Sequence, residues 1–103
     1  MSGTVQMETI QRLVARKHSV AAKDFKGQQQ EESIALPRQL AMYLASVLTD
    51  LSPKDIGRAF GGRDHVDVLH ARRKIQRILA DPFFLETVNK LQSDIKMAEP
   101  HNS

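Results

Sequence analysis

The segment from Ser52 to Arg77 reads SPKDIGRAFGGRDHVDVLHARRKIQR and contains a short helical pattern, two glycines and a longer helical pattern. Residues 52–55 form a helix-start signature, with Ser at the N-cap, Pro at N1 and Asp at N3. Gly61-Gly62 ends this short helix, and Asp64 is placed to cap the next one. The order of helix, glycine turn and helix predicts a helix-turn-helix.

The second helix of this pair has an apolar face and a basic face. The residues expected to pack inward are Val68, Ala71, Ile75, Ile78 and Leu79. The opposite, exposed stripe consists of Val66, His70, Arg73 and Arg77, with His65 and Asp67 beside its N-terminal end. From Arg58 to Arg77 the chain has six Lys/Arg and two acids. A DNA recognition helix has this pattern, and an ordinary solvated helix face has it too.

Other uses of the same residues fit less well. His65 and His70 are metal-ligand types, but a spacing of five separates them around a helix, and no His-Glu-x-x-His run is present. Gly61-Gly62 precedes a helix N-terminus, where a phosphate can bind, but a glycine C-cap explains the pair more simply. Asp64 and His65 are sequence neighbours without a nucleophile beside them. We therefore expect no metal site and no enzymatic activity.

The rest of the chain also follows helical periodicity, without the alternation of a β-strand. Helices are expected over about residues 5–18 and 22–25, and a central core helix from about residue 33. Ser33 is placed to cap the central helix, and Pro37 is tolerated near its start. The apolar face of that helix is expected to be Pro37, Leu40, Ala41, Leu44, Val47, Leu48 and Leu51.

The remaining segments complete an all-α domain. Residues 27–33, GQQQEES, have no apolar member and predict an exposed loop. Asp81-Pro82 repeats the cap-plus-proline pattern and starts a last helix, in which Phe84, Val88, Leu91 and Ile95 align. We find no internal repeat, and expect a single domain over residues 1–97 with a polar tail over 98–103. The predicted fold is a compact five- to six-helix domain containing a helix-turn-helix.

Composition narrows the possible functions. The chain has 103 residues, 15 Lys+Arg against 12 Asp+Glu, and no Cys. The absence of Cys excludes disulfide frameworks, Cys-ligated zinc and thiol nucleophiles. No apolar run approaches the ~20 residues that span a bilayer, so no membrane association is expected. The formal net charge of +3 favours a polyanionic partner only slightly.

Two stretches resemble one known family. LPRQLAMYL (residues 36–44) followed by IGRAFGGRDH and VLHA (residues 56–65 and 68–71) are similar to the C-terminal DNA-binding domain of the bacterial replication initiator DnaA. The resemblance runs without a gap from about Met7 to about Leu91. It implies sequence-specific binding of double-stranded DNA at short asymmetric boxes of the TTATNCACA kind, at an origin or promoter.

The resemblance also implies roles for single residues. Asp64 and His65 would contact bases in the major groove. Val66 and Asp67 stand where the family usually has a Thr pair that reads thymine and neighbouring bases. Gln30 aligns with the arginine of the family's basic loop, which enters the minor groove. The residues implied to lie near phosphates are Arg38, Gln39, Lys54, Arg63, His70, Arg73 and Lys74.

This chain departs from the family at the loop and at the Thr pair. The loop is GQQQEE rather than rich in Arg and Lys, so Gln30 brings no charge to the negative potential of a narrow minor groove. Glu31 and Glu32 would repel phosphate. Val66 keeps a methyl group for thymine, and Asp67 can accept a hydrogen bond from cytosine N4. We therefore expect altered or weakened box specificity.

A second function class stays open: a domain that kept the fold as a protein-interaction or regulatory module, with little DNA binding. The Gln/Glu loop favours this alternative, and the retained cations oppose it. The resemblance further implies a monomer, a cytoplasmic and nucleoid-associated location in a bacterium, and a possible replication-regulatory protein partner. The sequence has no Gly-x-x-x-x-Gly-Lys-Ser/Thr run, so we expect no cofactor here. ATP and Mg would act only through the ATPase domain of full-length family members.

Overall fold

The computed structural model describes residues 5–28 and 30–99, and within these ranges it contains five α-helices, one 3-10 helix and no strand. The helices are α1 (Met7–Lys17), η1 (Ala22–Lys26), α2 (Glu32–Leu48), α3 (Pro53–Ala59), α4 (His65–Ile78) and α5 (Pro82–Ala98). The all-α prediction and the order of its elements are confirmed. None of the helices described is long and apolar enough to cross a bilayer.

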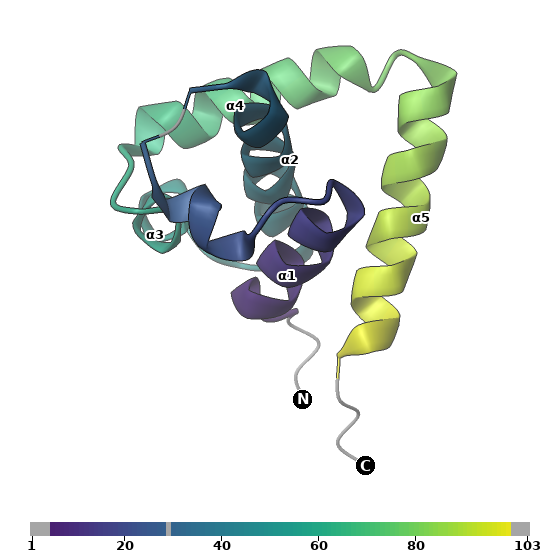
Figure 1. Ribbon diagram of the computed structural model, residues 1–103, viewed down its shortest axis with the longest axis horizontal. Coiled ribbons are helices and arrows are strands. Elements are labelled where there is room, and N and C mark those ends of the chain that lie inside the picture. Colours follow the sequence, from purple (N-terminus) through teal and green to yellow (C-terminus); the bar gives the residue numbers. More distant parts are fainter. Residues whose placement is uncertain (1–4, 29, 100–103) are drawn as a thin grey trace.

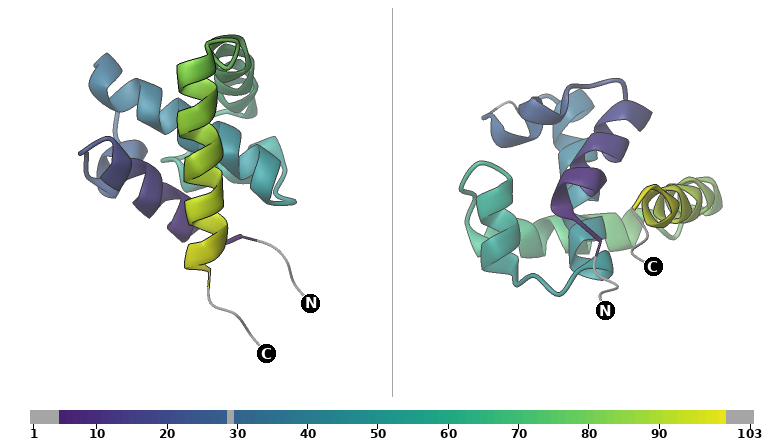
Figure 2. Two further views of the ribbon diagram at one scale, coloured as in Figure 1. Left: turned by 90° about the vertical axis from the view of Figure 1, so that its right-hand side faces the viewer. Right: turned by 90° about the horizontal axis from the view of Figure 1, so that it is seen from below.

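Helix α2 is the centre of the domain. It packs against α1 on one side and against α4 on the other, and α3 lies beside the N-terminal part of α4 (Figure 1 and Figure 2). The side chains with no solvent exposure come from every element: Ile10, Val14, Phe25, Leu44, Ile56, Phe60, Val68, Ile75 and Ile95. The buried ring of Phe25 anchors η1 to the core, with its centroid 6.2 Å from that of Phe60.

Helix α5 packs on α1 at one edge of the molecule (Figure 1). Its buried residues are Val88, Leu91 and Ile95, and Phe84 packs partly buried against the core, so the predicted apolar face is confirmed. Asp81 caps the helix by accepting a hydrogen bond from the backbone N–H of Phe83 at 3.3 Å. Ala98 is the last residue of the helix, and residues 100–103 of the predicted polar tail lie outside the described residues.

Two predictions about α2 were wrong. The helix begins at Glu32, so Ser33 lies inside its first turn, and the N-cap residue Glu31 makes no side-chain capping bond. The predicted apolar face also extended too far, because Val47 and Leu51 are 49% and 40% exposed. Leu51 is exposed because the helix ends at Leu48 and the chain leaves it in an extended conformation at Thr49. Val47 lies in the last turn, on the flank of the buried face.

Candidate nucleic-acid interface

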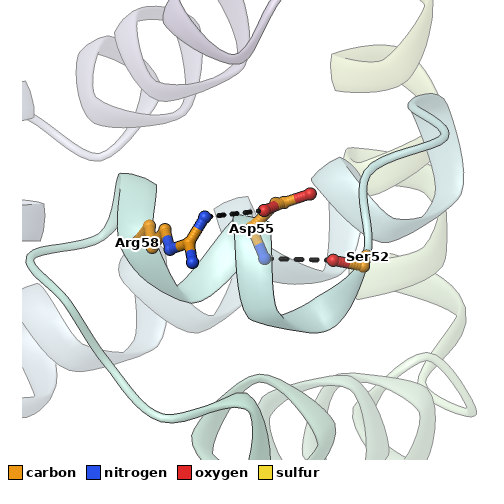
Figure 3. Close-up of polar contacts among 3 residues, drawn as sticks. All are labelled: Ser52, Asp55 and Arg58. Atoms are coloured by element: carbon orange, nitrogen blue, oxygen red, sulfur yellow. Dashed lines mark hydrogen bonds and ion pairs between the residues drawn. The ribbon is translucent and has the colours of Figure 1, made fainter.

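Helix α3 starts as its sequence predicts. The hydroxyl of Ser52 accepts a hydrogen bond from the backbone N–H of Asp55 at 3.2 Å (Figure 3). The carboxylate of Asp55 pairs with the guanidinium of Arg58 at 3.3 Å, one turn along the helix. Pro53 occupies N1 without costing a hydrogen bond, because that N–H has no helical partner anyway. These local bonds fix where the first helix of the pair begins.

The turn between α3 and α4 depends on three glycines. Gly61 and Gly62 have φ of 88° and 78°, in the left-handed region that glycine enters without steric cost. A Cβ on Gly61 would overlap the carbonyl oxygen of Lys26 at the end of η1, whereas one on Gly62 would meet open space. A Cβ on Gly57 would overlap the carbonyl oxygen of Arg63. The glycine pair forms the turn of a helix-turn-helix, as the sequence predicted.

Asp64 and His65 lie at the N-terminus of α4 and contact each other. Asp64 is the N-cap and accepts a hydrogen bond from the backbone N–H of Val66 at 3.2 Å. The same carboxylate lies 2.9 Å from Nδ1 of His65, which fixes the imidazole beside it. Both side chains stay more than half exposed. The two residues implied to read bases are therefore held together at the exposed tip of the helix.

The two faces of α4 are as predicted. Val68, Ala71 and Ile75 are buried, and Ile78 and Leu79 pack partly buried beside them. The exposed stripe is Val66, His70, Arg73 and Arg77. Leu69 is also exposed, at 38%, next to Val66 at 40%. The exposure of Leu69 was not predicted from the sequence, although its position around the helix, close to that of Val66, already placed it toward the exposed side.

A polar cleft of about 230 Å³ lies where the loop before α2, the first half of α2 and the start of α4 meet. The cleft is lined by Gln30, Arg38, Gln39, Met42, Arg63, Asp67 and His70. Six of these seven residues were predicted from sequence to contact DNA. They come from distant parts of the chain, so the fold itself brings them to one place.

Two arginines give the cleft its positive charge. Arg38 is only 5% exposed, and its burial, followed by the nearby charge of Arg63, lowers its pKa below the ordinary value of an arginine. A guanidinium still remains protonated near neutral pH. Arg63 donates a hydrogen bond from Nη2 to the carbonyl oxygen of Gly27 at 2.7 Å. Arg63 therefore ties the loop to the turn while its charge contributes to the cleft.

The remaining predicted phosphate contacts, Lys54, Arg73 and Lys74, do not line the cleft. Nζ of Lys74 lies 3.1 Å from a carboxylate oxygen of Glu32. This ion pair links the recognition helix α4 to the first turn of α2. Lys54 is exposed at the start of α3, and Arg73 lies in the exposed stripe of α4. Within the described residues, no three His, Cys, Asp or Glu side chains gather as metal ligands would.

A comparison with protein-family models gives one match. The model described as the bacterial dnaA protein helix-turn-helix matches residues 7–75, which is more than half of the chain. The matched range runs from α1 into the last turn of α4 and contains the turn, the cleft and both exposed base-reading candidates. It ends before α5, whereas the sequence analysis extended the resemblance to about Leu91.

Proposed function

The chain belongs to the bacterial DnaA helix-turn-helix family of DNA-binding domains that act in replication initiation, and we propose that it binds duplex DNA at sites similar to the family's boxes, with a base preference that differs from the family's. The observation that carries the proposal is the position of α4. Its exposed N-terminal residues stand beside a cleft that holds two arginines. Base readers and phosphate contacts thereby share one surface, as a helix in the major groove requires.

Base reading is assigned to the start of α4. The major groove is about 12 Å wide and admits an α-helix, whose N-terminal side chains reach base edges. Asp64 and His65 occupy this end, and Val66 follows with an exposed methyl surface suited to thymine. Asp67 lines the cleft with the arginines, and its carboxylate accepts from cytosine N4 if it enters the groove. The Asp in place of a Thr supports a shift of preference toward cytosine at that position.

Phosphate binding is assigned to the cleft and its surroundings. Arg38, Gln39 and His70 line the cleft, and their donors suit an oxyanion in it. Each phosphate neutralised by a cation adds ~0.9 to the slope of log affinity against log salt. The proposal needs no bound nucleotide or metal, and a monomer suffices for an asymmetric site. The further residues assigned to phosphates are Lys54, Arg63, Arg73 and Lys74.

Fluorescence anisotropy with a labelled duplex tests the proposal. A duplex carrying the family box is titrated at several salt concentrations, against a scrambled duplex and against boxes varied at each position. We expect a preferred duplex whose advantage over the scrambled one disappears in His65→Ala. His18→Ala is the matched control, because His18 lies at the end of α1 and bonds to the carbonyl oxygen of Val14. Absence of binding to every duplex at low salt overturns the proposal.

Asp67→Asn tests the base assignment separately. Asn keeps the shape of Asp, but its amide has one donor and one acceptor group, which together complement N7 and N6 of adenine. We expect the preferred base at one position to change and affinity to rise, because a negative charge leaves an anionic groove. If the preferred base does not change, Asp67 interacts with the arginines of the cleft and does not contact a base.

The second candidate is a protein-interaction module, favoured by the acids beside the cleft. Glu31 and Glu32 stand at the start of α2, and Glu32 already holds Lys74. This alternative predicts little dependence of duplex binding on salt, and capture of a replication-regulatory protein by the same face. The steep salt dependence of phosphate contacts separates the two candidates.

A further inference from the structure

The chain carries a second basic surface that the proposed function does not use. Residues 12–26 contain five cations and a single acid, Asp24. All five cations are exposed, and none forms an ion pair with another residue within 5–28 and 30–99. They are Arg12, Arg16, Lys17, Lys23 and Lys26. We call these five residues the α1–η1 surface.

The α1–η1 surface faces away from the core along two ordered elements. Arg12 and Arg16 are four residues apart on α1, so they share one face, while Ile10 and Val14 are fully buried on the other. Lys23 and Lys26 are three residues apart on a 3-10 helix, where such side chains eclipse each other. The cations are therefore presented on one side of each element, and the apolar sides are used by the core.

The α1 cations of this surface (Arg12, Arg16 and Lys17) lie across α2 from the recognition helix, whereas η1 ends beside the turn before α4, where the carbonyl oxygen of Lys26 adjoins Gly61. Helix α2 stands between α1 and α4, and the views of Figure 1 and Figure 2 agree on this order. A straight duplex in contact with the exposed face of α4 therefore does not also contact the outer face of α1. Outside residues 12–26 and 58–77 the acids outnumber the cations, so the positive charge is concentrated in these two segments.

We propose that the α1 cations of this surface, Arg12, Arg16 and Lys17, bind the phosphate backbone of a second duplex segment, without sequence preference, so that one domain bridges two DNA segments. A membrane surface fits less well, because an interfacial helix inserts an apolar face, and none of the large exposed apolar side chains lies in residues 5–26. Single strands fit less well too, since they stack on exposed aromatic rings, and Phe25, the aromatic residue of this segment, is buried. Closely spaced phosphates match exposed, unpaired cations.

A bridging assay tests this inference. A box-bearing duplex is fixed to beads, the protein is added, and retention of a free, labelled, unrelated duplex is measured at low salt. We expect retention by the wild-type chain and loss to background in Arg12→Gln/Arg16→Gln/Lys17→Gln. The amount of this variant that binds to the fixed, box-bearing duplex is expected to equal that of the wild type. The double variant Lys90→Gln/Lys96→Gln, which removes exposed cations from α5, is the control and should bridge like the wild type.

A second measurement keeps this inference separate from the proposed function. His65→Ala/Arg73→Gln/Arg77→Gln weakens the recognition helix but keeps the cleft, so the α1 cations are reported by the difference in binding of a single unrelated duplex between this variant and the same variant carrying Arg12→Gln/Arg16→Gln/Lys17→Gln as well. Low-salt binding should persist in the first of these variants, and its salt slope should fall by ~0.9 for each contacting cation then removed from α1. Failure of the wild type to retain the second duplex overturns the inference. So does equal retention by the three-fold α1 variant, because bridging would then come from two recognition helices in a dimer, which sedimentation detects.

Discussion

The start of α4 and the loop before α2 flank the same cleft, but they carry opposite charge. The segment from Arg58 to Arg77 keeps six cations against two acids, whereas residues 27–33 contain two glutamates and no cation. The resemblance implies a basic loop in the family. Under the proposed function, this contrast predicts that the chain keeps its contacts to the major groove and to phosphates, while its minor-groove contact loses its charge.

The two regions are nevertheless joined physically. Arg63 in the turn donates a hydrogen bond to the carbonyl oxygen of Gly27. Gly61 packs against the carbonyl oxygen of Lys26. Lys74 forms an ion pair with Glu32. A change in the loop therefore reaches the recognition helix through these contacts. Charge and position are therefore specified separately: these contacts hold the loop beside the cleft, although the loop has two glutamates and no cation.

The largest expected effect comes from breaking the contact between turn and loop. Gly61→Ala places a methyl group on the Lys26 carbonyl and also keeps an unfavourable φ of 88°, so we expect a loss of about 2–5 kcal/mol in unfolding free energy. Gly62→Ala is the matched control. It has a similar φ but open space, and should lose only about 1–2 kcal/mol. Urea denaturation measures both. Equal losses would mean that the turn does not depend on η1.

These two regions also differ in how far the sequence predicts them. The start of each helix in the helix-turn-helix was predictable because Ser52 and Asp64 bond to backbone groups three and two residues ahead. The loop contacts were not, since Arg63 and Lys74 bond to partners 36 and 42 residues away. No local pattern reveals such pairs. They exist only once α2 and α4 have packed together.

The candidate site divides in the same way. Periodicity predicted the exposed stripe of α4, and the resemblance supplied Gln30, Arg38 and Gln39. These residues line one cleft together with Asp67 because of the tertiary fold. Helical periodicity does not indicate which helices pack together. The two errors on α2 have local causes. Glu31 and not Ser33 precedes the first helical turn, and the helix stops at Leu48 before its apolar pattern ends.

Restoring one charge to the loop tests whether charge is what separates the two regions. Gln30→Arg places a guanidinium at the edge of the cleft, from where it can enter the minor groove. A charge-assisted hydrogen bond is worth roughly 1.5–3 kcal/mol. We expect affinity for the preferred duplex to rise about ten-fold or more, with a salt slope steeper by ~0.9. Asn89→Arg adds the same charge on α5 and should change affinity little. Equal gains in both variants would reveal a general effect of net charge.

Releasing Lys74 is expected to act more weakly. Glu32→Gln removes the carboxylate that pairs with Nζ at 3.1 Å and leaves the lysine free for a phosphate. Because the pair is partly exposed, its loss should change stability by less than about 1 kcal/mol, while the salt slope of duplex binding steepens by up to ~0.9. Glu86→Gln on α5 is the control for removing an exposed acid. Duplex binding that is the same in both variants would mean that Lys74 stays away from phosphate.

The smallest expected effect concerns a single methyl contact. Val66 is 40% exposed at the start of α4, and an apolar side chain there is suited to the C5-methyl group of thymine. Replacing the thymines of the preferred duplex with deoxyuridine one at a time should weaken binding a few-fold at one position, in line with ~0.8 kcal/mol for a buried methyl-sized group. In Val66→Ala that position should no longer respond, whereas Leu85→Ala on α5 should respond like the wild type. A response that persists in Val66→Ala would move the methyl contact to the neighbouring exposed Leu69, and the reading surface of α4 would then extend one turn further along the helix.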